Sequence, residues 1–216
     1  MKHLTLNHHT LPEALALEAL PAWLDELGEE FHAIDTVNWA DYPYRPEAAF
    51  RIVATDRGFV INYRVSEASV AAVAEGDCGH VWEDSCVEFF SCPTDDGTYY
   101  NIEANCVGTV LVAAGKDRNA RTFAPREVLD SIGRWSSLGR DNFSERVGDV
   151  TWQLVLLVPY SVYFQHDVRS VEGLKLRANF YKCGDNLRQP HFLSWNPIDV
   201  PSPDFHRPDF FGELEG

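Results

Sequence analysis

Apolar and polar residues alternate along several short runs of this chain, as they do in β-strands that bury one face. The clearest example spans residues 50–65, where two alternating runs flank the turn-forming sequence Asp-Arg-Gly at residues 56–58. Two further runs, at residues 83–91 and 98–107, are separated by Pro-Thr-Asp-Asp-Gly, a sequence rich in turn formers. The pattern therefore predicts two β-hairpins.

Other segments extend the expected sheets. Residues 174–182 alternate cleanly, whereas residues 152–158 form an almost unbroken apolar run, typical of a strand that is buried on both faces within a sheet. The shorter expected elements are strands at residues 109–114 and 210–214, a helix or extended arm within residues 11–31, and a helical turn at residues 125–132. Many short strands and little helix predict an all-β chain, either a sandwich or a barrel.

Composition narrows the possible partners. The chain has 216 residues, of which 45% are hydrophobic and 24% charged, enough apolar surface to close a core. We therefore expect a single domain over residues 1–216, with residues 1–34 as an N-terminal arm packed on it. The formal net charge of −15 repels polyanions, which disfavours nucleic acid and anionic membrane surfaces as partners, and no partner protein is indicated.

The cysteines and the N-terminus indicate the compartment. Five cysteines without a C-x-x-C pair favour reduced, buried thiols over a disulfide framework or a zinc ribbon. Residues 1–10 hold a single Lys and no apolar run, so they lack the features of a secretory signal. Both features predict a cytoplasmic protein, or a secreted or periplasmic one if the sequence has been trimmed.

The strand expected at residues 82–92 becomes informative when its side chains are sorted by face. Apolar side chains occupy one face and Glu88 points to the other, because side chains in a strand alternate. If both strands of the hairpin cover the same core, Glu88 lies across from Asn101, Glu103 or a near neighbour, with Asn105 on the same face. That face gains three further polar side chains if residues 174–182 join the same sheet, namely Arg177, Asn179 and Tyr181.

Carboxylates, carboxamides and an Arg beside aromatic rings suit a sugar. Planar polar groups bond vicinal hydroxyls in pairs, and flat rings cover the C–H face of the sugar. Trp82, six residues before Glu88, and Trp195 are the candidate stacking platforms. A simpler interpretation stays open, since outer faces of antiparallel sheets are normally polar and tryptophans are usually well buried.

Several stretches of the sequence also carry a resemblance to a known family. They read VWEDSCVEFF at residues 81–90, YYNIEAN at 99–105, NFYKCG at 179–184, HFLSW at 191–195 and PDFHRPDFFG at 203–212. Over roughly residues 35–214 the chain resembles the family 9 carbohydrate-binding modules and their stand-alone relatives. The resemblance implies an antiparallel β-sandwich of jelly-roll-like topology that binds a mono- or oligosaccharide, most often at a sugar end.

The resemblance also implies roles for particular residues. In the xylanase-associated members, a terminal sugar is held between two tryptophans beside a glutamate and amides. Carried over by motif, this pattern points to Trp82 and Glu88, and also to Trp195 and Asn105.

Members of the family can hold calcium, and wider relatives of the sandwich bind haem. Four acidic loop residues offer oxygen ligands to calcium, although their spacing is unlike that of an EF-hand: Asp95, Asp96, Asp185 and Asp204. Haem ligation by methionine is implausible, because the only methionine is Met1. We therefore expect no cofactor, with calcium as the open alternative.

Two other functions stay open at this point. Glu88 and Glu103 are the obvious carboxylate pair for a glycoside hydrolase of carbohydrate catabolism. However, both are expected on the same side of one sheet, whereas an acid and a nucleophile must address opposite faces of the anomeric centre. The third possibility is a structural or protein-interaction sandwich, which a Trp82 enclosed in the core would favour.

Overall fold

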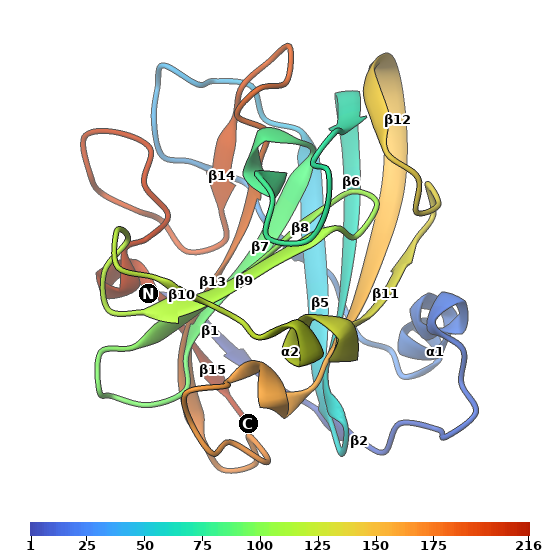
Figure 1. Ribbon diagram of the computed structural model, residues 1–216, viewed down its shortest axis with the longest axis vertical. Helices are drawn as coiled ribbons and strands as arrows, with labels where there is room; N and C mark the ends of the chain where they lie inside the picture. The colour runs from blue at the N-terminus through green and yellow to red at the C-terminus, as the bar shows by residue number, and fades with distance from the viewer.

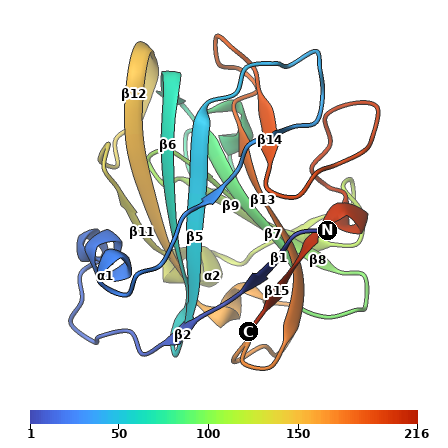
Figure 2. The same ribbon diagram turned by 180° about the vertical axis from the view of Figure 1, so that it is seen from behind.

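The computed structural model describes all 216 residues, which form two β-sheets packed face to face (Figures 1 and 2). One sheet has nine strands. Its main path is, in spatial order, β1 (His3–Thr5), β15 (Gly212–Glu215), β13 (Lys175–Cys183), β7 (Cys86–Cys92), β8 (Tyr99–Asn105), β9 (Val110–Gly115) and β10 (Thr122–Phe123). The last two strands branch from β13, since β14 (Phe192–Ser194) pairs with β13 and β4 (Thr36–Val37) pairs with β14.

The other sheet has six strands. In spatial order they are β11 (Gly133–Ser136), β12 (Phe143–Val158), β6 (Gly58–Ala72), β5 (Glu47–Thr55) and β2 (His8–His9), with β3 (His32–Ala33) also paired to β5. Neighbouring strands are antiparallel except for two short N-terminal ones, since β1 runs parallel to β15 and β2 runs parallel to β5. The predicted all-β sandwich, mostly antiparallel, is therefore confirmed.

Helices are few and short. The two α-helices are α1 (Leu20–Glu26) and α2 (Arg126–Ser131). The 3-10 turns are η1 (Leu17–Ala19), η2 (Val81–Glu83), η3 (Tyr160–Val162) and η4 (Pro208–Phe210). Pro21, which interrupts the helical pattern in the sequence, lies in the first turn of α1. A proline is tolerated there, because the N–H that it lacks would have no partner within the helix. None of the helices has the length and apolar character needed to cross a membrane.

The first predicted hairpin is formed by β5 and β6. Its turn depends on Gly58, which has a positive φ of 131° and lies so close to the Val158 carbonyl that a Cβ would collide with it. Both β6 and β12 are longer than their sequence patterns suggest, because Ser66–Ala72 and Phe143–Thr151 pair with each other as an extension of the sheet. The predicted position of residues 152–158 within the sheet is confirmed, since β12 pairs with β11 and with β6.

The second predicted hairpin is formed by β7 and β8. Its first strand begins at Cys86 instead of residue 82, because residues 81–83 form the turn η2. The Asp84 carboxylate fixes the chain at this point by accepting hydrogen bonds from the backbone N–H groups of Val73 and Ala74, at 2.9 and 3.1 Å. Trp82 is therefore carried by a turn at the edge of the sheet.

The main core lies between the two sheets. It is a cluster of 40 buried residues in which Phe50 of β5 stacks on Phe180 of β13, with ring centroids 3.5 Å apart. Alternation sends these side chains inward from both sheets, which leaves Glu88, Tyr181 and their neighbours on the outer face of the nine-stranded sheet.

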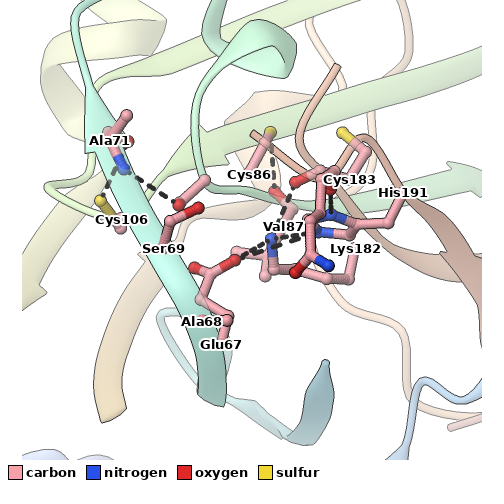
Figure 3. Close-up of polar contacts among 12 residues, drawn as sticks. Glu67, Ala68, Ser69, Ala71, Cys86, Val87, Cys106, Lys182, Cys183 and His191 are labelled. Carbon is pink, nitrogen blue, oxygen red and sulfur yellow. Dashed lines mark hydrogen bonds and ion pairs between the residues drawn. The ribbon is translucent and has the colours of Figure 1, made fainter. Parts of the chain in front are cut away.

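The two sheets also meet through a buried ion pair. The Lys182 ammonium of β13 lies 2.9 Å from the Glu67 carboxylate of β6, and both side chains are completely buried (Figure 3). Lys182 also donates to His191 Nε2, at 2.8 Å, and to the Cys183 carbonyl, also at 2.8 Å. The Trp152 indole N–H donates to the other oxygen of Glu67, at 2.7 Å. This cluster fixes one sheet relative to the other.

Both outer faces of the sandwich are partly covered. Helix α1 packs on the six-stranded sheet through a small apolar cluster that includes Leu24 and Val155. Segments around Trp39 and between β14 and β15 fold over the nine-stranded sheet and bury much of its outer face, including Phe90 and Tyr181 (Figures 1 and 2). The outer face is thus less exposed than its polar pattern suggests, and its open part is a cleft.

Candidate functional site

The cleft lies on the outer face of the nine-stranded sheet and has a volume of about 290 Å³. Strands β7, β8 and β9 supply its floor, and the turn η2 together with the segments that follow β9, β13 and β14 supplies its walls. Its polar and charged lining residues are Glu88, Asn101, Glu103, Arg118, Arg121, Asp185, Asp204 and His206. Its main aromatic lining residues are Trp82, Phe123, Phe192 and Phe205.

Two carboxylates form the centre of the floor. Glu88 of β7 and Glu103 of β8 are direct cross-strand partners, and their residues are only 3% and 5% exposed. Glu103 Oε1 accepts a hydrogen bond from the Asn101 amide at 2.9 Å, whereas its buried Oε2 has no partner. An unpaired buried acceptor is costly, so Glu103 Oε2 marks a position where a ligand donor is expected.

Glu88 is held by thiols. Its Oε1 atom accepts from Cys183 Sγ at 3.2 Å and from Cys86 Sγ at 3.9 Å. Burial raises the pKa of the Cys86 thiol to about 12 and that of Cys183 well above its ordinary value, so both thiols keep their protons as donors. The predicted burial of the cysteines is confirmed at Cys86, Cys92, Cys106 and Cys183, whereas Cys78 is half-buried.

Burial also shifts the titration of the two carboxyl groups. It raises the pKa of Glu103 to about 7 and that of Glu88 well above its ordinary value, and the charge of Glu103 adds to the rise at Glu88. Two carboxylates in direct cross-strand contact disfavour simultaneous ionisation. The floor can therefore present one carboxyl O–H donor next to one carboxylate acceptor.

Arg121 closes one side of the floor. Its guanidinium lies over the Tyr99 ring, at 3.9 Å from carbon to ring centroid, and donates to the Asn101 side-chain oxygen and to the Tyr99 carbonyl. Its Nε–H is buried and has no partner. Two other lining residues, Arg118 and Asp204, form a partly exposed ion pair at 3.1 Å. Arg121 and Glu103 thus carry a buried unpaired donor and a buried unpaired acceptor, and both residues line the same cleft.

Aromatic side chains form the walls. Trp82 is half-buried on η2 and stacks against His80, with ring centroids 4.5 Å apart. Phe205 stacks on the buried Tyr181 ring at 4.2 Å and an angle of 6°, which leaves Phe205 between the sheet and the cleft. Trp82 is therefore available to a ligand and is not enclosed in the core.

Four of the sequence-predicted ligand residues are brought together. Trp82, Glu88, Asn101 and Glu103 all line the cleft. The expected register is also confirmed, because Glu88 pairs directly with Glu103. The face sorting succeeded at these positions because strand alternation and hairpin register are local properties of the sequence.

The other five predicted ligand residues do not line the cleft. The side-chain amides of Asn105 and Asn179 form hydrogen bonds inside the fold. Asn105 donates to Asp84 and accepts from the Thr109 N–H. Asn179 donates to the Asn196 carbonyl and accepts from the Asn196 N–H. Tyr181 is buried beneath Phe205, and Arg177 donates to the Pro208 carbonyl. Trp195 is 4% exposed and packs in the main core.

Several lining residues had no clear signal in the sequence. Arg118 and Arg121 come from the segment between β9 and β10, and nothing in their local sequence distinguishes them from ordinary surface residues. Phe192 and Phe205 belong to the aromatic-rich stretch that follows residue 191. That richness indicates a segment packed on the body, but it does not reveal which rings face a cleft.

The acidic loop residues considered for calcium are divided between two places. Asp185 and Asp204 line the cleft, whereas Asp95 and Asp96 lie in the turn between β7 and β8. There the Asp96 carboxylate accepts hydrogen bonds from the N–H and the hydroxyl of Thr98, both at 2.9 Å. The one group of three or more His, Cys, Asp or Glu side chains that converge as metal ligands is Cys86, Glu88 and Cys183.

Comparisons with known proteins agree with this architecture. A model of carbohydrate-binding family 9 matches residues 18–215. A Bacteroides uniformis protein, described as a candidate carbohydrate-binding protein, is similar at 50% identity and a TM-score of 0.96, with 99% of this chain and 98% of that chain covered. A search of curated proteins finds no match.

Two more distant structures share the fold. They are of a family 9 carbohydrate-binding module from Caldicellulosiruptor kristjanssonii, one in complex with glucose and the other with cellotriose. Each is 11% identical to this chain with a TM-score of 0.56, and the alignments cover 99% of this chain and 95% and 93% of those chains.

Proposed function

The chain belongs to carbohydrate-binding family 9, and from this premise we propose that it binds the end of a mono- or oligosaccharide in the cleft lined by Trp82, Glu88 and Glu103. The cleft volume of about 290 Å³ is near the lower limit of small-molecule sites, which hold about 300–1,000 Å³. That size suits one or two sugar rings better than a long stretch of polysaccharide.

One observation carries the proposal above all. The buried Glu103 Oε2 and the buried Arg121 Nε–H lack partners, and both belong to residues that line the same aromatic-walled cleft. A sugar hydroxyl both donates and accepts, so vicinal hydroxyls can satisfy the two groups together. Trp82 then covers the apolar C–H face of the ring, as aromatic side chains do in contact with flat apolar surfaces.

The first ligands to test are glucose and short glucans, because the two distant family members were solved with glucose and cellotriose. Isothermal titration of the chain with glucose, xylose and cellotriose should give saturable binding for at least one sugar. The variant Glu103→Gln should weaken that binding by about tenfold to a hundredfold, since a hydrogen bond to a charged group contributes about 1.5–3 kcal/mol.

The matched control is Glu127→Gln, which changes an exposed carboxylate on α2 and should leave the affinity unchanged. Absence of saturable binding across a broad panel of sugars would overturn the proposal. An affinity for sugar that is the same in Glu103→Gln and in the wild type would move the site away from this cleft.

The geometry favours binding over hydrolysis. Glu88 and Glu103 lie side by side on one floor, as direct partners on adjacent strands. A retaining or inverting glycosidase needs its two carboxyl groups on opposite sides of the scissile bond. Incubation with oligosaccharides should therefore release no reducing sugar; release that is abolished in Glu88→Gln would instead establish the hydrolase alternative.

The proposed binding scheme uses no cofactor. Calcium stays a secondary proposal, supported only by the oxygen atoms of Asp185 and Asp204 at the cleft and of Asp95 and Asp96 in the β7–β8 turn. Thermal unfolding with calcium and with a chelator tests it. A rise in Tm with calcium that is lost in Asp96→Asn or in Asp185→Asn would support it, and an unchanged Tm would exclude it.

A further inference from the structure

Two thiols and one carboxylate converge on the outer face of the nine-stranded sheet. Cys86 of β7 and Cys183 of β13 are direct partners on adjacent antiparallel strands. Glu88 follows Cys86 by two positions and therefore projects to the same side of the sheet. Both sulfur atoms point away from the Glu67 carboxylate of the core (Figure 3). Cys183 and Glu88 line the cleft directly, and Cys86 lies behind them.

The separations of these ligand atoms match those around a tetrahedral metal ion. Cys183 Sγ and Cys86 Sγ lie 3.2 and 3.9 Å from Glu88 Oε1, and all three ligand atoms are within 4.8 Å of one another. Zinc binds sulfur at about 2.3 Å and carboxylate oxygen at about 2.0 Å, which places a sulfur and an oxygen ligand about 3.5 Å apart in a tetrahedral site. The observed separations fall on either side of that value.

The carboxylate of Glu88 also lacks adequate partners within the chain. It is 3% exposed, and the two thiols, which are weak donors, are its only hydrogen-bond donors. No Lys or Arg forms an ion pair with it, because Arg118 pairs with Asp204 and Arg121 donates to Asn101 and to backbone carbonyls. A buried carboxyl group without a cation or a strong donor beside it ionises only when a positive group joins it, so Glu88 is free to serve as the carboxylate ligand of a cation.

We propose that Cys86, Cys183 and Glu88 form a binding site for a soft divalent cation, with zinc as the best-fitting ion. Two sulfur ligands select zinc over calcium or magnesium, which prefer oxygen alone. Each thiol releases its proton to solvent as its sulfur binds the ion. A fourth ligand would come from the cleft, which is open to water and is lined by Cys183, Glu88 and Asp185. Three protein ligands and one open position are typical of zinc sites that exchange a small ligand.

The test uses the full chain, kept reduced with a phosphine and freed of metal by a chelator that is then removed. Titration with Co²⁺ should saturate at one ion per chain and produce the thiolate-to-cobalt charge-transfer absorption and the intense visible bands of a tetrahedral site. Zinc should then displace the cobalt. Absence of the charge-transfer absorption in the wild-type chain would overturn the proposal without any variant.

Variants identify the ligands. Competition with a chromophoric chelator should show that Cys86→Ser and Cys183→Ser each weaken zinc binding by about a hundredfold or more, because removal even of outer-shell partners commonly costs tenfold to a hundredfold. The control is Cys92→Ser, another buried cysteine of β7, which lies outside the cluster and should bind zinc like the wild type. Equal zinc affinity in all three variants would overturn the proposal.

The outcome is separable from that of the proposed sugar binding. Titration of the metal-free wild-type chain with sugar, in the presence of chelator, measures the sugar site alone. Sugar binding without a cobalt–thiolate spectrum contradicts only the metal site. A cobalt–thiolate spectrum with no response to sugar contradicts only the sugar site.

Discussion

At the residue scale, the proposed sugar binding depends on polar atoms that the fold buries without pairing. Glu103 Oε2 and Arg121 Nε have no partner, whereas most buried polar atoms of the chain do. The neighbouring Asn101 amide illustrates the contrast, because its nitrogen donates to Glu103 and its oxygen accepts from Arg121. Asn101 therefore positions the two residues that are left to meet a ligand.

Trp82 offers the most direct residue-scale prediction. Trp82→Ala should weaken sugar binding by about tenfold to a hundredfold, because Trp82 is the only tryptophan among the residues that line the cleft and its ring offers a broad apolar face. Isothermal titration is the suitable measurement, since it does not depend on tryptophan fluorescence. The control Trp23→Ala changes a half-buried tryptophan on α1, on the other sheet, and should bind normally. Normal affinity in Trp82→Ala would remove this residue from the site.

Sequence reasoning at this scale succeeded where the determinants were local. Strand alternation and the hairpin register place Glu88, Asn101 and Glu103 on one face, and both can be read from neighbouring residues. The same reasoning could not place Trp195 or Asn179. Their surroundings are set by contacts with Phe50 and with the Asn196 backbone, which depend on how distant segments fold back.

At the element scale, the β7–β8 hairpin and the turn into β9 form one unit that supports the floor. Asn105 ends β8 and joins three parts of the chain, because it accepts from the N–H groups of Val107 and Thr109 and donates to Asp84. Asp84 in turn fixes the end of β6 through Val73 and Ala74. Asn105 thus stabilises the frame around the cleft without lining it.

Asn105→Ala should therefore act on stability and not on ligand contact. We expect the free energy of unfolding to fall by about 2–4 kcal/mol, from three lost hydrogen bonds at about 1 kcal/mol each and a partly unpaired Asp84. Urea unfolding measures this change, with Asn119→Ala, an exposed loop residue, as the control. Loss of sugar binding in a variant of unchanged stability would return Asn105 to the ligand site.

The elements were largely predictable and their extents were not. Both hairpins, the strand at residues 152–158 and the turn of α2 appear where the hydrophobic pattern predicts them. The hydrophobic pattern did not predict two segments that extend β6 and β12, namely Ser66–Ala72 and Phe143–Thr151. Residues 143–149 are mostly polar and exposed, and they form a strand only because they pair with β6.

At the scale of the whole molecule, the arrangement of the two sheets depends on a buried polar cluster within an apolar core. Glu67 of β6, Lys182 of β13 and His191 before β14 meet with side chains that are completely buried. His191 accepts from Lys182 through Nε2 and donates through Nδ1 to the Gln189 carbonyl, at 2.8 Å. The cluster links the core to the segment that builds the wall of the cleft.

Replacement of one member of the Glu67–Lys182 ion pair should lower the free energy of unfolding more than replacement of both members. Lys182→Met leaves Glu67 buried without its cation and should cost about 3–5 kcal/mol of stability. The double variant Glu67→Gln with Lys182→Met should recover most of that loss, because the new side-chain amide is neutral and its oxygen still accepts from Trp152. Urea unfolding of the three proteins decides the matter. A double variant no more stable than Lys182→Met would contradict this account.

His191 should also make stability depend on pH. Burial, with a further contribution from Lys182, lowers the pKa of His191 well below its ordinary 6.5, so the folded chain keeps the ring neutral. The unfolded chain binds a proton below about pH 6.5, and this contribution to stability falls with falling pH at about 1.4 kcal/mol per unit.

Other groups act in this pH range, and Glu103 acts in the opposite sense because its pKa is raised to about 7. The contribution of His191 is therefore isolated by comparison with His191→Gln, which keeps one acceptor and one donor. Urea unfolding between about pH 7 and about pH 5 should show a shallower loss of stability in the variant than in the wild type. Parallel slopes would show that His191 does not titrate on unfolding.

The most direct measurement of the central claim is a crystal structure of the chain with a bound sugar, in a lattice that leaves the cleft open. We predict a terminal ring with its C–H face on Trp82 and a hydroxyl within hydrogen-bond distance of Glu103 Oε2. The account would be contradicted if the cleft were empty and the sugar were bound at another place, for example in the groove beside Arg45, Glu47 and Arg64.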